Sequence, residues 1–389
     1  MIKKITIFLW IFACISLFLY SFVQVDLGLT LNRASFVQTI QKSFQYIGYF
    51  NRPLSTYLFT SVIVFLYATY CFTLYGVYKK WLSGKIIWTI VICASIILLF
   101  SYNAFSYDLF NYIFDAKIIT QYGQSPYEHK ALDYPSDPML GFMHWTHRIY
   151  PYGPLWLVFT TPLSFLGGGY FLPTFYLFKL LMVGGYLLCS VMIYKIANKT
   201  KLVNPIFALT FFALNPFVIV ESLVSAHNDI VMMGLVLVST YLLISKHAVK
   251  GFLFFVLSVL VKFATILLIP LFLWYPISKQ KNKDFIFFLG SVVLMMVGVY
   301  LASSRTTFQP WYFLLVLPFA SIISNRYFVF IPVVIFSSLI LFQYVPYFYT
   351  GNYDPPVPVI MNQMLGWSIG LSIGATLIFR FFKKFKKVI

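Results

Sequence analysis

The sequence predicts an all-α, polytopic membrane protein, and three observations favour this fold class. Of the 389 residues, 60% are apolar and only 10% are charged, whereas soluble domains carry about 25% charged residues. Apolar runs long enough to cross a bilayer of about 30 Å recur along the whole chain. The 28 Lys and Arg residues outnumber the 10 Asp and Glu residues and cluster between these runs. These features exclude a soluble enzyme, a disordered chain and a nucleic-acid-binding protein.

The apolar runs give the expected membrane helices in chain order. They cover 5–23, 57–78, 86–104, 170–196, 203–221, 229–245, 251–277, 285–303, 311–324, 327–343 and 363–381. The shorter run 152–166 is expected to be a juxtamembrane or re-entrant helix on the outer side. The run 251–277 has basic clusters at both ends, so we expect a hairpin that turns near Lys262. The total is about twelve crossings of the plasma membrane, with both termini in the cytoplasm.

The charge pattern orients this topology. Short cytoplasmic loops collect Lys and Arg, so we place the basic clusters around 3–4, 79–85, 195–201, 246–250, 279–283 and 380–387 inside the cell. Every acidic residue except Asp284 then maps to the outer side or to outer helix ends. Because Asp and Glu influence insertion little, this asymmetry indicates chemistry on the outer face. Longer and more polar outer loops are the alternative explanation.

The topology divides the chain into three parts. Residues 1–104 are N-terminal membrane helices with an outer, amphipathic segment at 24–56. Residues 105–169 form an outer loop with juxtamembrane helices, and residues 170–389 form the transmembrane core and the C-terminal helices. The cysteines have no disulfide or zinc spacing, so we interpret them as buried small apolar residues; they are Cys14, Cys71, Cys93 and Cys189.

The densest polar stretch begins at Asp108. Asp108, Asn111, Tyr112 and Asp115 are spaced i, i+3, i+4 and i+7, so on a helix they form one polar stripe. Partial desolvation at the membrane surface raises the pKa of a carboxyl group, which suits a general base. We therefore expect a raised pKa at Asp108. A helix N-cap at Asp108 and a surface acid at Asp115 are the alternatives.

Two turn motifs follow in the same loop. Gly123-Gln124-Ser125-Pro126-Tyr127 is expected to end the helix and begin an extended segment. Tyr150-Pro151-Tyr152-Gly153-Pro154-Leu155 combines prolines with aromatic residues and predicts a stiff turn at the interface. An aromatic belt at the membrane surface explains the second motif equally well.

Polar residues at later helix ends are the remaining candidates. His227, Asn228 and Asp229 open an apolar run, and polar groups there are costly unless they are satisfied. Asp229 is able to cap its own helix. Lys262, between two apolar legs, is expected to meet an anion such as phosphate or to snorkel. Arg305 is either an interfacial anchor or a second phosphate ligand.

In this order the motifs resemble the GT-C glycosyltransferases. Within them, the chain is most similar to the polyprenol-phosphate-mannose-dependent mannosyltransferase-like proteins of bacteria and archaea. The resemblance spans 105–312 and rests on the stripe from Asp108, the Gly123–Tyr127 and Tyr150–Leu155 motifs, Asn215-Pro216, His227-Asn228-Asp229, Lys262 and Gln309-Pro310-Trp311-Tyr312. Ser125 stands where the family commonly has Asn, and Tyr152-Gly153-Pro154 replaces a tighter Pro-Pro.

The resemblance implies an integral-membrane glycosyltransferase of the cell envelope. It moves a hexose, mannose favoured, from a polyprenyl-phosphate donor to an acceptor hydroxyl on the outer face, with inversion. The acceptor is a glycan, a lipid or a protein. No cofactor is expected, although Asp108 and Asp115 are candidates to hold a divalent metal. One rival is a lipid or sugar transporter or flippase, which predicts acids at the bilayer midplane and an internal repeat. A second rival is a non-catalytic assembly or polymerase-like membrane protein that uses the same outer groove and tolerates Asp108→Asn.

The resemblance also implies residue roles. Asp108 matches the family's base, and Lys262 and Arg305 stabilise the leaving phosphate. His227, Asn228 and Asp229 hold the sugar or the phosphate. Trp311 and Tyr312 stack on the sugar or the prenyl chain. The other expected substrate contacts are Asn111, Tyr112, Asp115, Tyr127 and Tyr150.

Overall fold

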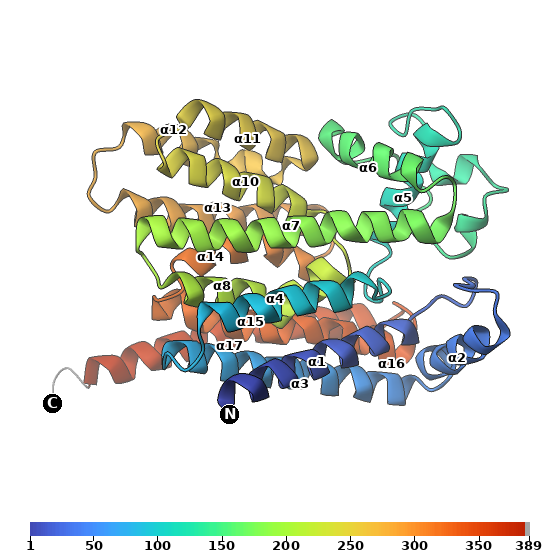
Figure 1. The fold of residues 1–389 in the computed structure, drawn as a ribbon, viewed down its shortest axis with the longest axis horizontal. Helices are drawn as coiled ribbons and strands as arrows, with labels where there is room; N and C mark the ends of the chain where they lie inside the picture. The colour runs from blue at the N-terminus through green and yellow to red at the C-terminus, as the bar shows by residue number, and fades with distance from the viewer. Residues whose placement is uncertain (386–389) are drawn as a thin grey trace.

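The computed structural model describes residues 1–385, and this part of the chain is helical without any strand. Its α-helices are α1 (Ile2–Val23), α2 (Ser35–Gln45), α3 (Arg52–Tyr78), α4 (Gly84–Leu99), α5 (Asp108–Thr120), α6 (Pro154–Leu166), α7 (Phe171–Thr200), α8 (Pro205–Ala213), α9 (Pro216–Val218), α10 (Asp229–Ile244), α11 (Ala248–Val261), α12 (Ile269–Ile277), α13 (Lys283–Arg305), α14 (Leu317–Ile322), α15 (Tyr327–Ile340), α16 (Val345–Thr350) and α17 (Val357–Phe385). The π-helices are η1 (Tyr46–Phe50) and η4 (Ile219–Val224). The 3-10 helices are η2 (Ala131–Asp133), η3 (Pro138–Gly141), η5 (Phe263–Leu268), η6 (Pro310–Leu315) and η7 (Leu341–Tyr344). Most of the long helices lie side by side in one bundle (Figure 1).

The all-α membrane fold is confirmed, whereas about twelve crossings are not. By length and composition, six described helices are able to cross a membrane: α1, α3, α7, α13, α17 and the segment Tyr327–Thr350. A seventh span results if Pro205–Ala213 and Pro216–Val224, which are bent by 50°, are counted together. Shorter apolar helices cover Gly84–Leu99, Pro154–Leu166, Asp229–Ile244, Ala248–Val261 and Phe263–Ile277. The predicted short helix at 152–166 therefore forms as α6.

Two runs expected to form single helices are broken, and here the prediction was wrong. The run 203–221 stops at Leu214, where Asn215 accepts a hydrogen bond from the backbone N–H of Phe217 at 3.0 Å and Pro216 opens α9. Proline lacks an N–H and starts a helix more readily than it continues one. The run 311–324 divides into η6 and α14, both largely buried in the bundle. Proline again stands at the start of each piece.

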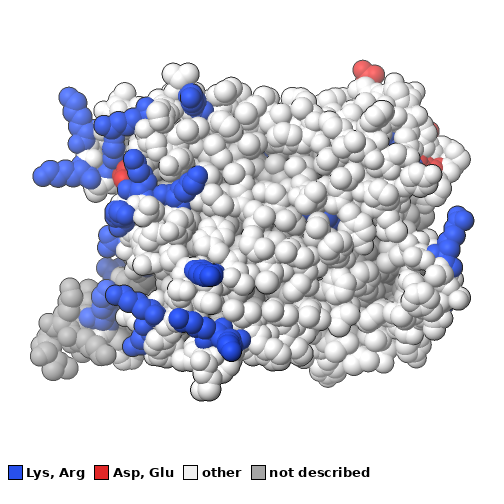
Figure 2. All heavy atoms as spheres, in the orientation of Figure 1, with Lys and Arg blue, Asp and Glu red and all other residues white. Residues whose placement is uncertain are grey.

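Charged side chains separate toward the two ends of the bundle (Figure 2). Most of the visible Lys and Arg side chains lie at the left end, where α13 begins and α17 ends, with an acidic side chain among them. The other visible acidic side chains lie at the right end beside α5 and α6, where few basic side chains are seen. The right end also carries α2, whose Phe36 and Ile40 are exposed. The predicted amphipathic character of the segment 24–56 is therefore observed in α2. The functional candidates in the loop 105–150 belong to this acidic end.

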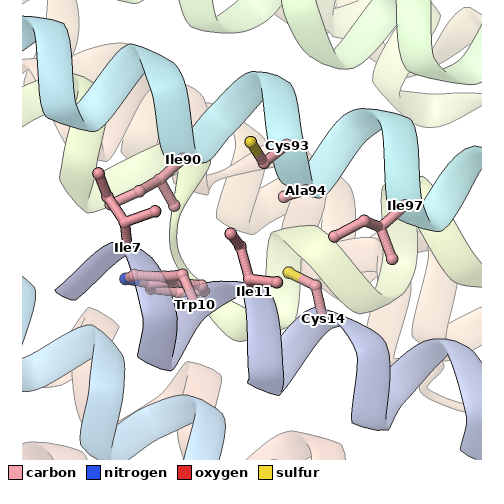
Figure 3. A pocket seen from close by; sticks show the side chains of 8 residues that line it. All are labelled: Ile7, Trp10, Ile11, Cys14, Ile90, Cys93, Ala94 and Ile97. Carbon is pink, nitrogen blue, oxygen red and sulfur yellow. The ribbon is translucent and has the colours of Figure 1, made fainter. Parts of the chain in front are cut away.

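The packing of α1 against α4 shows the apolar character of the rest of the bundle. The contact between the two helices is lined by Ile, Ala, Cys and Trp side chains, with Cys14 and Cys93 among them (Figure 3). Cys14 and Cys189 are buried as predicted, but Cys93 is half-buried and Cys71 is exposed. An exposed thiol on α3 is compatible with a lipid-facing surface, because cysteine behaves as a small apolar residue. The side chains of this lining offer no hydrogen-bond partners to a polar substrate.

Candidate active site

The predicted polar stripe forms on α5. Asp108 is the first residue of the helix, and the Tyr112 hydroxyl one turn later donates to Oδ2 of Asp108 at 3.4 Å. Asp108 does not cap the helix with its side chain, so the N-cap alternative is not observed. Asn111 donates its side-chain amide to the backbone oxygen of Tyr107 at 3.2 Å, so that amide is engaged within the helix.

His227 connects α5 to the middle of the chain. Its Nδ1 atom lies 3.5 Å from Oδ2 of Asp108, and its Nε2 atom lies 3.3 Å from Oε2 of Glu221 on η4. The ring stacks on Trp311 of η6, with centroids 4.2 Å apart and planes inclined by 16°. His227 and Glu221 are fully buried, whereas the Asp108 side chain is 16% exposed. Residues more than 200 positions apart (311 − 108 = 203) are thereby brought into one cluster.

Asp229 and Lys262 form the second charged pair of the site. The Lys262 Nζ atom lies 2.9 Å from Oδ1 and 2.8 Å from Oδ2 of Asp229. Lys262 itself is extended between α11 and η5, which confirms the predicted break in the run 251–277. The anion expected near Lys262 is thus a carboxylate of the protein, and Asp229 does not cap its own helix.

The Tyr150–Leu155 motif docks on this break. The backbone N–H of Gly153 donates to the oxygen of Val261 at 3.1 Å, and the Tyr150 hydroxyl donates to the oxygen of Gly153 at 2.8 Å. A Cβ atom at position 153 would lie 2.0 Å from the backbone oxygen of Leu260. The approach of the two backbones therefore requires glycine here.

Tyr127 and Tyr150 support the turn around Tyr152. Tyr127 donates its hydroxyl to the backbone oxygen of Tyr152 at 3.5 Å and packs edge-on against Tyr150, with centroids 5.0 Å apart. Tyr152 in turn packs against Tyr112 at 5.3 Å. Of these tyrosines, Tyr152 is the one in contact with the stripe on α5. Its hydroxyl-bearing ring was not among the residues predicted for the site.

Arg148 is the other residue that the sequence did not single out. Its guanidinium lies 5.3 Å from the ring centroid of Tyr152, and its charge lowers the pKa of both Asp108 and Asp115. Its Nη2 atom is buried and forms no hydrogen bond with any described residue. The only signal in the sequence was its position just before the Tyr150 motif. Arg148 therefore adds a cation to the site.

Arg305 and Tyr312 lie at the margin of the site. Arg305 is exposed at the end of α13 and forms no ion pair with the acids of the described chain. Tyr312 packs edge-on against Trp311, with centroids 5.8 Å apart, and its hydroxyl lies 3.4 Å from that of Thr306. The predicted phosphate contact by Arg305 therefore has no support from its position, while Trp311 has a direct contact with His227.

The two carboxyl groups on α5 have opposite pKa shifts. Burial alone would raise the pKa of Asp108, but the adjacent His227 and the charges of Arg148 and Lys262 outweigh burial and lower it. Our expectation of a raised pKa was wrong, because it considered desolvation without these cations. Burial raises the pKa of Asp115 to about 7, opposed by Arg148 and assisted by Asp108. At neutral pH, Asp108 is therefore ionised and Asp115 is divided between its two forms.

Buried polar atoms without partners surround this cluster. Native proteins leave few such atoms, and each of them calls for an explanation. Within residues 1–385, those at this site are Asp115 Oδ2, Arg148 Nη2, Trp156 Nε1, Glu221 Oε2, Ser222 Oγ, Ser225 Oγ, both ring nitrogens of His227 and both side-chain atoms of Asn228. They include acceptors, donors and hydroxyl groups. In the described part of the chain, no group of three His, Cys, Asp or Glu side chains is arranged to hold a metal ion.

Comparison with known proteins identifies the family. Residues 13–278, more than half of the chain, match the family described as alpha-(1->6)-mannopyranosyltransferase, N-terminal domain. The chain belongs to this family. It is also 27% identical over 178 residues to alpha-(1->6)-mannopyranosyltransferase A of Corynebacterium glutamicum, covering 46% of this chain and 36% of that protein. The aligned part thus spans only about a third of this relative's length. No solved structure matches.

The family match includes most of the cluster. Asp108, Arg148, Glu221, His227 and the Asp229–Lys262 pair all fall inside the matched residues of this mannopyranosyltransferase-family chain. Trp311 falls outside them. The resemblance seen in the sequence motifs is therefore confirmed at the level of the family, while the roles of individual residues stay predictions.

Proposed function

We propose that this chain is a membrane mannosyltransferase that moves mannose from a polyprenyl-phosphate donor to an acceptor hydroxyl, with inversion. The observation that carries the proposal is the partly exposed Asp108 carboxylate beside buried polar atoms that have no partner. A pyranose ring presents many hydroxyl groups and suits such a set of donors and acceptors. Membership of the alpha-(1->6)-mannopyranosyltransferase family supports mannose as the sugar.

Asp108 is the base in this proposal. Its Oδ2 atom faces His227 and Tyr112, whereas Oδ1 has no hydrogen-bond partner among residues 1–385. As the acceptor oxygen bonds to the anomeric carbon, Oδ1 takes the hydroxyl proton. The bond from that carbon to the phosphate oxygen breaks, and its electron pair leaves with the phosphate. Direct attack opposite the leaving group inverts the configuration.

Arg148 and Lys262 stabilise the leaving phosphate in this proposal. The phosphate gains negative charge as it leaves, and positioned cations lower that barrier. Arg148 has a buried, unpartnered Nη2 atom, and an arginine fork suits phosphate oxygens. Lys262 is paired with Asp229 but remains 26% exposed. Asn228, with a buried and unpartnered amide, is assigned to the sugar hydroxyls.

We further propose that the site faces the outside of the plasma membrane. Lys and Arg concentrate at the opposite end of the bundle from α5 and α6 (Figure 2), and cytoplasmic segments collect these residues. Both termini would then be cytoplasmic. The relative in Corynebacterium glutamicum is an alpha-(1->6)-mannopyranosyltransferase by name, which supports the primary hydroxyl of a hexose in a cell-envelope glycan as the acceptor.

Transfer by the purified protein in lipid nanodiscs tests this function. The donor is polyprenyl-phosphate mannose, the acceptor is a mannoside, and NMR of the product reports linkage and anomeric configuration. Asp108→Asn is expected to lower kcat/KM by about 10³-fold, whereas Asp133→Asn, a change at an exposed outer-loop carboxylate, should not.

Three outcomes contradict the proposal in different ways. No transfer by the wild type from any polyprenyl-phosphate sugar refutes the enzymatic function, and donor movement across the bilayer without product would favour the flippase. A normal rate for Asp108→Asn refutes the base. If activity is lost with Asp115→Asn but kept with Asp108→Asn, the base is Asp115, whose pKa of about 7 suits that role.

A further inference from the structure

A buried carboxylate lies behind the base. Glu221 is fully buried on η4, and its Oε1 atom accepts a hydrogen bond from the Tyr344 hydroxyl at 2.9 Å. Its Oε2 atom lies 3.3 Å from Nε2 of His227 and has no other polar partner among the described residues. A carboxylate without solvent is costly unless a cation is close. His227 is the cation within ion-pair distance.

The neighbouring buried lysine does not take this place. Lys179 on α7 donates to the hydroxyl of Ser101 at 3.0 Å, to the backbone oxygen of Val224 at 3.3 Å and to the backbone oxygen of Leu223. Its amino group therefore meets the carboxyl end of η4, where unpaired backbone carbonyls accept hydrogen bonds. It anchors the segment that carries Glu221, while the carboxylate itself is left to His227.

His227 has an acidic oxygen at each ring nitrogen. Both contacts, at 3.5 Å to Asp108 and 3.3 Å to Glu221, are ion-pair distances without hydrogen-bond geometry. Two acidic groups this close to one buried ring favour its positively charged imidazolium form. Burial would lower the pKa of His227, but Asp108 and Glu221 raise it to about 9. Stacking on Trp311 fixes the ring plane and adds a favourable contact for a cationic ring.

From this geometry we propose that Glu221 is a positioning residue for the transfer: its carboxylate holds His227 as an imidazolium, which in turn orients Asp108 and keeps it ionised. The inference rests on the proposed function, in which Asp108 is the base. Because His227 and Tyr112 both face Oδ2, the Oδ1 atom is directed to the acceptor. Glu221 acts through His227 and does not touch the substrate.

The pH dependence of this unit involves all the ionisable groups around it. Those facing Asp108 and His227 from the surrounding elements are Tyr112, Asp115, Arg148, Tyr152, Glu221, Asp229, Lys262 and Tyr344. Arg148 and Lys262 support the ionised form of Asp108 independently of Glu221. Loss of Glu221 should therefore weaken the ionisation of Asp108 without abolishing it. The effect is expected as a shift of the acid limb in the pH profile of kcat/KM.

The test is the pH profile of kcat/KM for mannosyl transfer. Glu221→Gln preserves the shape of the side chain but removes its charge, so His227 loses its proton more easily and the pKa of Asp108 rises. The acid limb of the profile is expected to move to higher pH by about one unit, which lowers kcat/KM about tenfold at a pH on that limb. In Asp133→Asn, the matched control, an exposed carboxylate 3.6 Å from His129 is neutralised and the limb should stay in place.

A double-mutant cycle separates positioning from a purely structural role. If Glu221 acts through His227, Glu221→Gln should shift the acid limb in the wild type but not in a His227→Gln background. An unmoved limb in Glu221→Gln, or the same shift in both backgrounds, overturns the inference. A wild type without transfer activity would instead refute the proposed function.

The wild type provides a second measurement if the Glu221 variant does not fold. Its rate should fall as the pH rises through about 9, where His227 loses its proton. Asp133→Asn should follow the same profile. A wild-type rate that is constant across this interval overturns the inference without any variant.

Discussion

Replacing Gly153 by alanine tests how the outer loop is joined to the break at Lys262. The added Cβ would lie 2.0 Å from the oxygen and 2.6 Å from the carbonyl carbon of Leu260, whereas ordinary contacts begin at 3.4 Å. The two segments must therefore separate by more than about 1 Å, and a misplacement of this size is able to cost about 10²-fold in rate. The hydrogen bond from Gly153 to Val261 is lost as well.

Mannosyl transfer and thermal unfolding in detergent measure the two consequences. Gly153→Ala is expected to lower kcat/KM about 100-fold and to destabilise the fold by about 1–3 kcal/mol. Gly141→Ala is the matched control in the same outer loop, because no atom lies within 4 Å of its added Cβ. A Gly153→Ala protein with wild-type activity and an unchanged Tm would refute the docking described for this motif.

Three further changes test the charges and rings of the site. Asp115→Asn should stabilise the protein at pH 8 by at most about 4 kcal/mol and hardly at pH 4. The reason is the raised pKa of Asp115, which makes the buried carboxylate unfavourable as the pH rises from 3.8 through about 7. An equal change in Tm at both pH values contradicts this prediction. Lys262→Met leaves Asp229 buried and unpaired and should lower the free energy of unfolding by about 2–4 kcal/mol. The double variant Lys262→Met/Asp229→Asn should recover most of this loss in chemical or thermal unfolding. Trp311→Ala removes the ring stacked on His227 and should reduce kcat more than tenfold, by about 1.5–2 kcal/mol in the barrier, while Trp311→Phe retains most of the rate; equal losses in both variants would show that stacking is not the cause.

Local patterns in the sequence were sufficient for the all-helical fold class and for α5. The i, i+4 spacing of Asp108 and Tyr112 depends only on helix geometry, and the structure brings their side chains together. The break at Lys262 was predicted from basic clusters at both ends of an apolar run, and the backbone is extended there. Such features require no knowledge of distant parts of the chain.

Long-range contacts account for what the sequence did not reveal. The pKa of Asp108 depends on His227, which is more than a hundred residues away (227 − 108 = 119). Arg148 and Tyr152 became candidates only when the outer loop was seen docked on α11. The splitting of 311–324 into η6 and α14 likewise depends on its packing within the bundle, since apolar composition alone does not distinguish one buried helix from two short ones.

Two of the contacts described above have a consequence for how this family's N-terminal domain is defined. Trp311 and Tyr344 lie beyond residue 278, where the family match ends, yet they touch His227 and Glu221. A chimera that joins residues 1–278 to the remainder of another relative would therefore keep Asp108. It would exchange the Trp311 ring, which stacks on His227, and the Tyr344 hydroxyl, which donates to Glu221. We expect the junction between such parents to be functional only if the incoming segment supplies equivalents of both side chains.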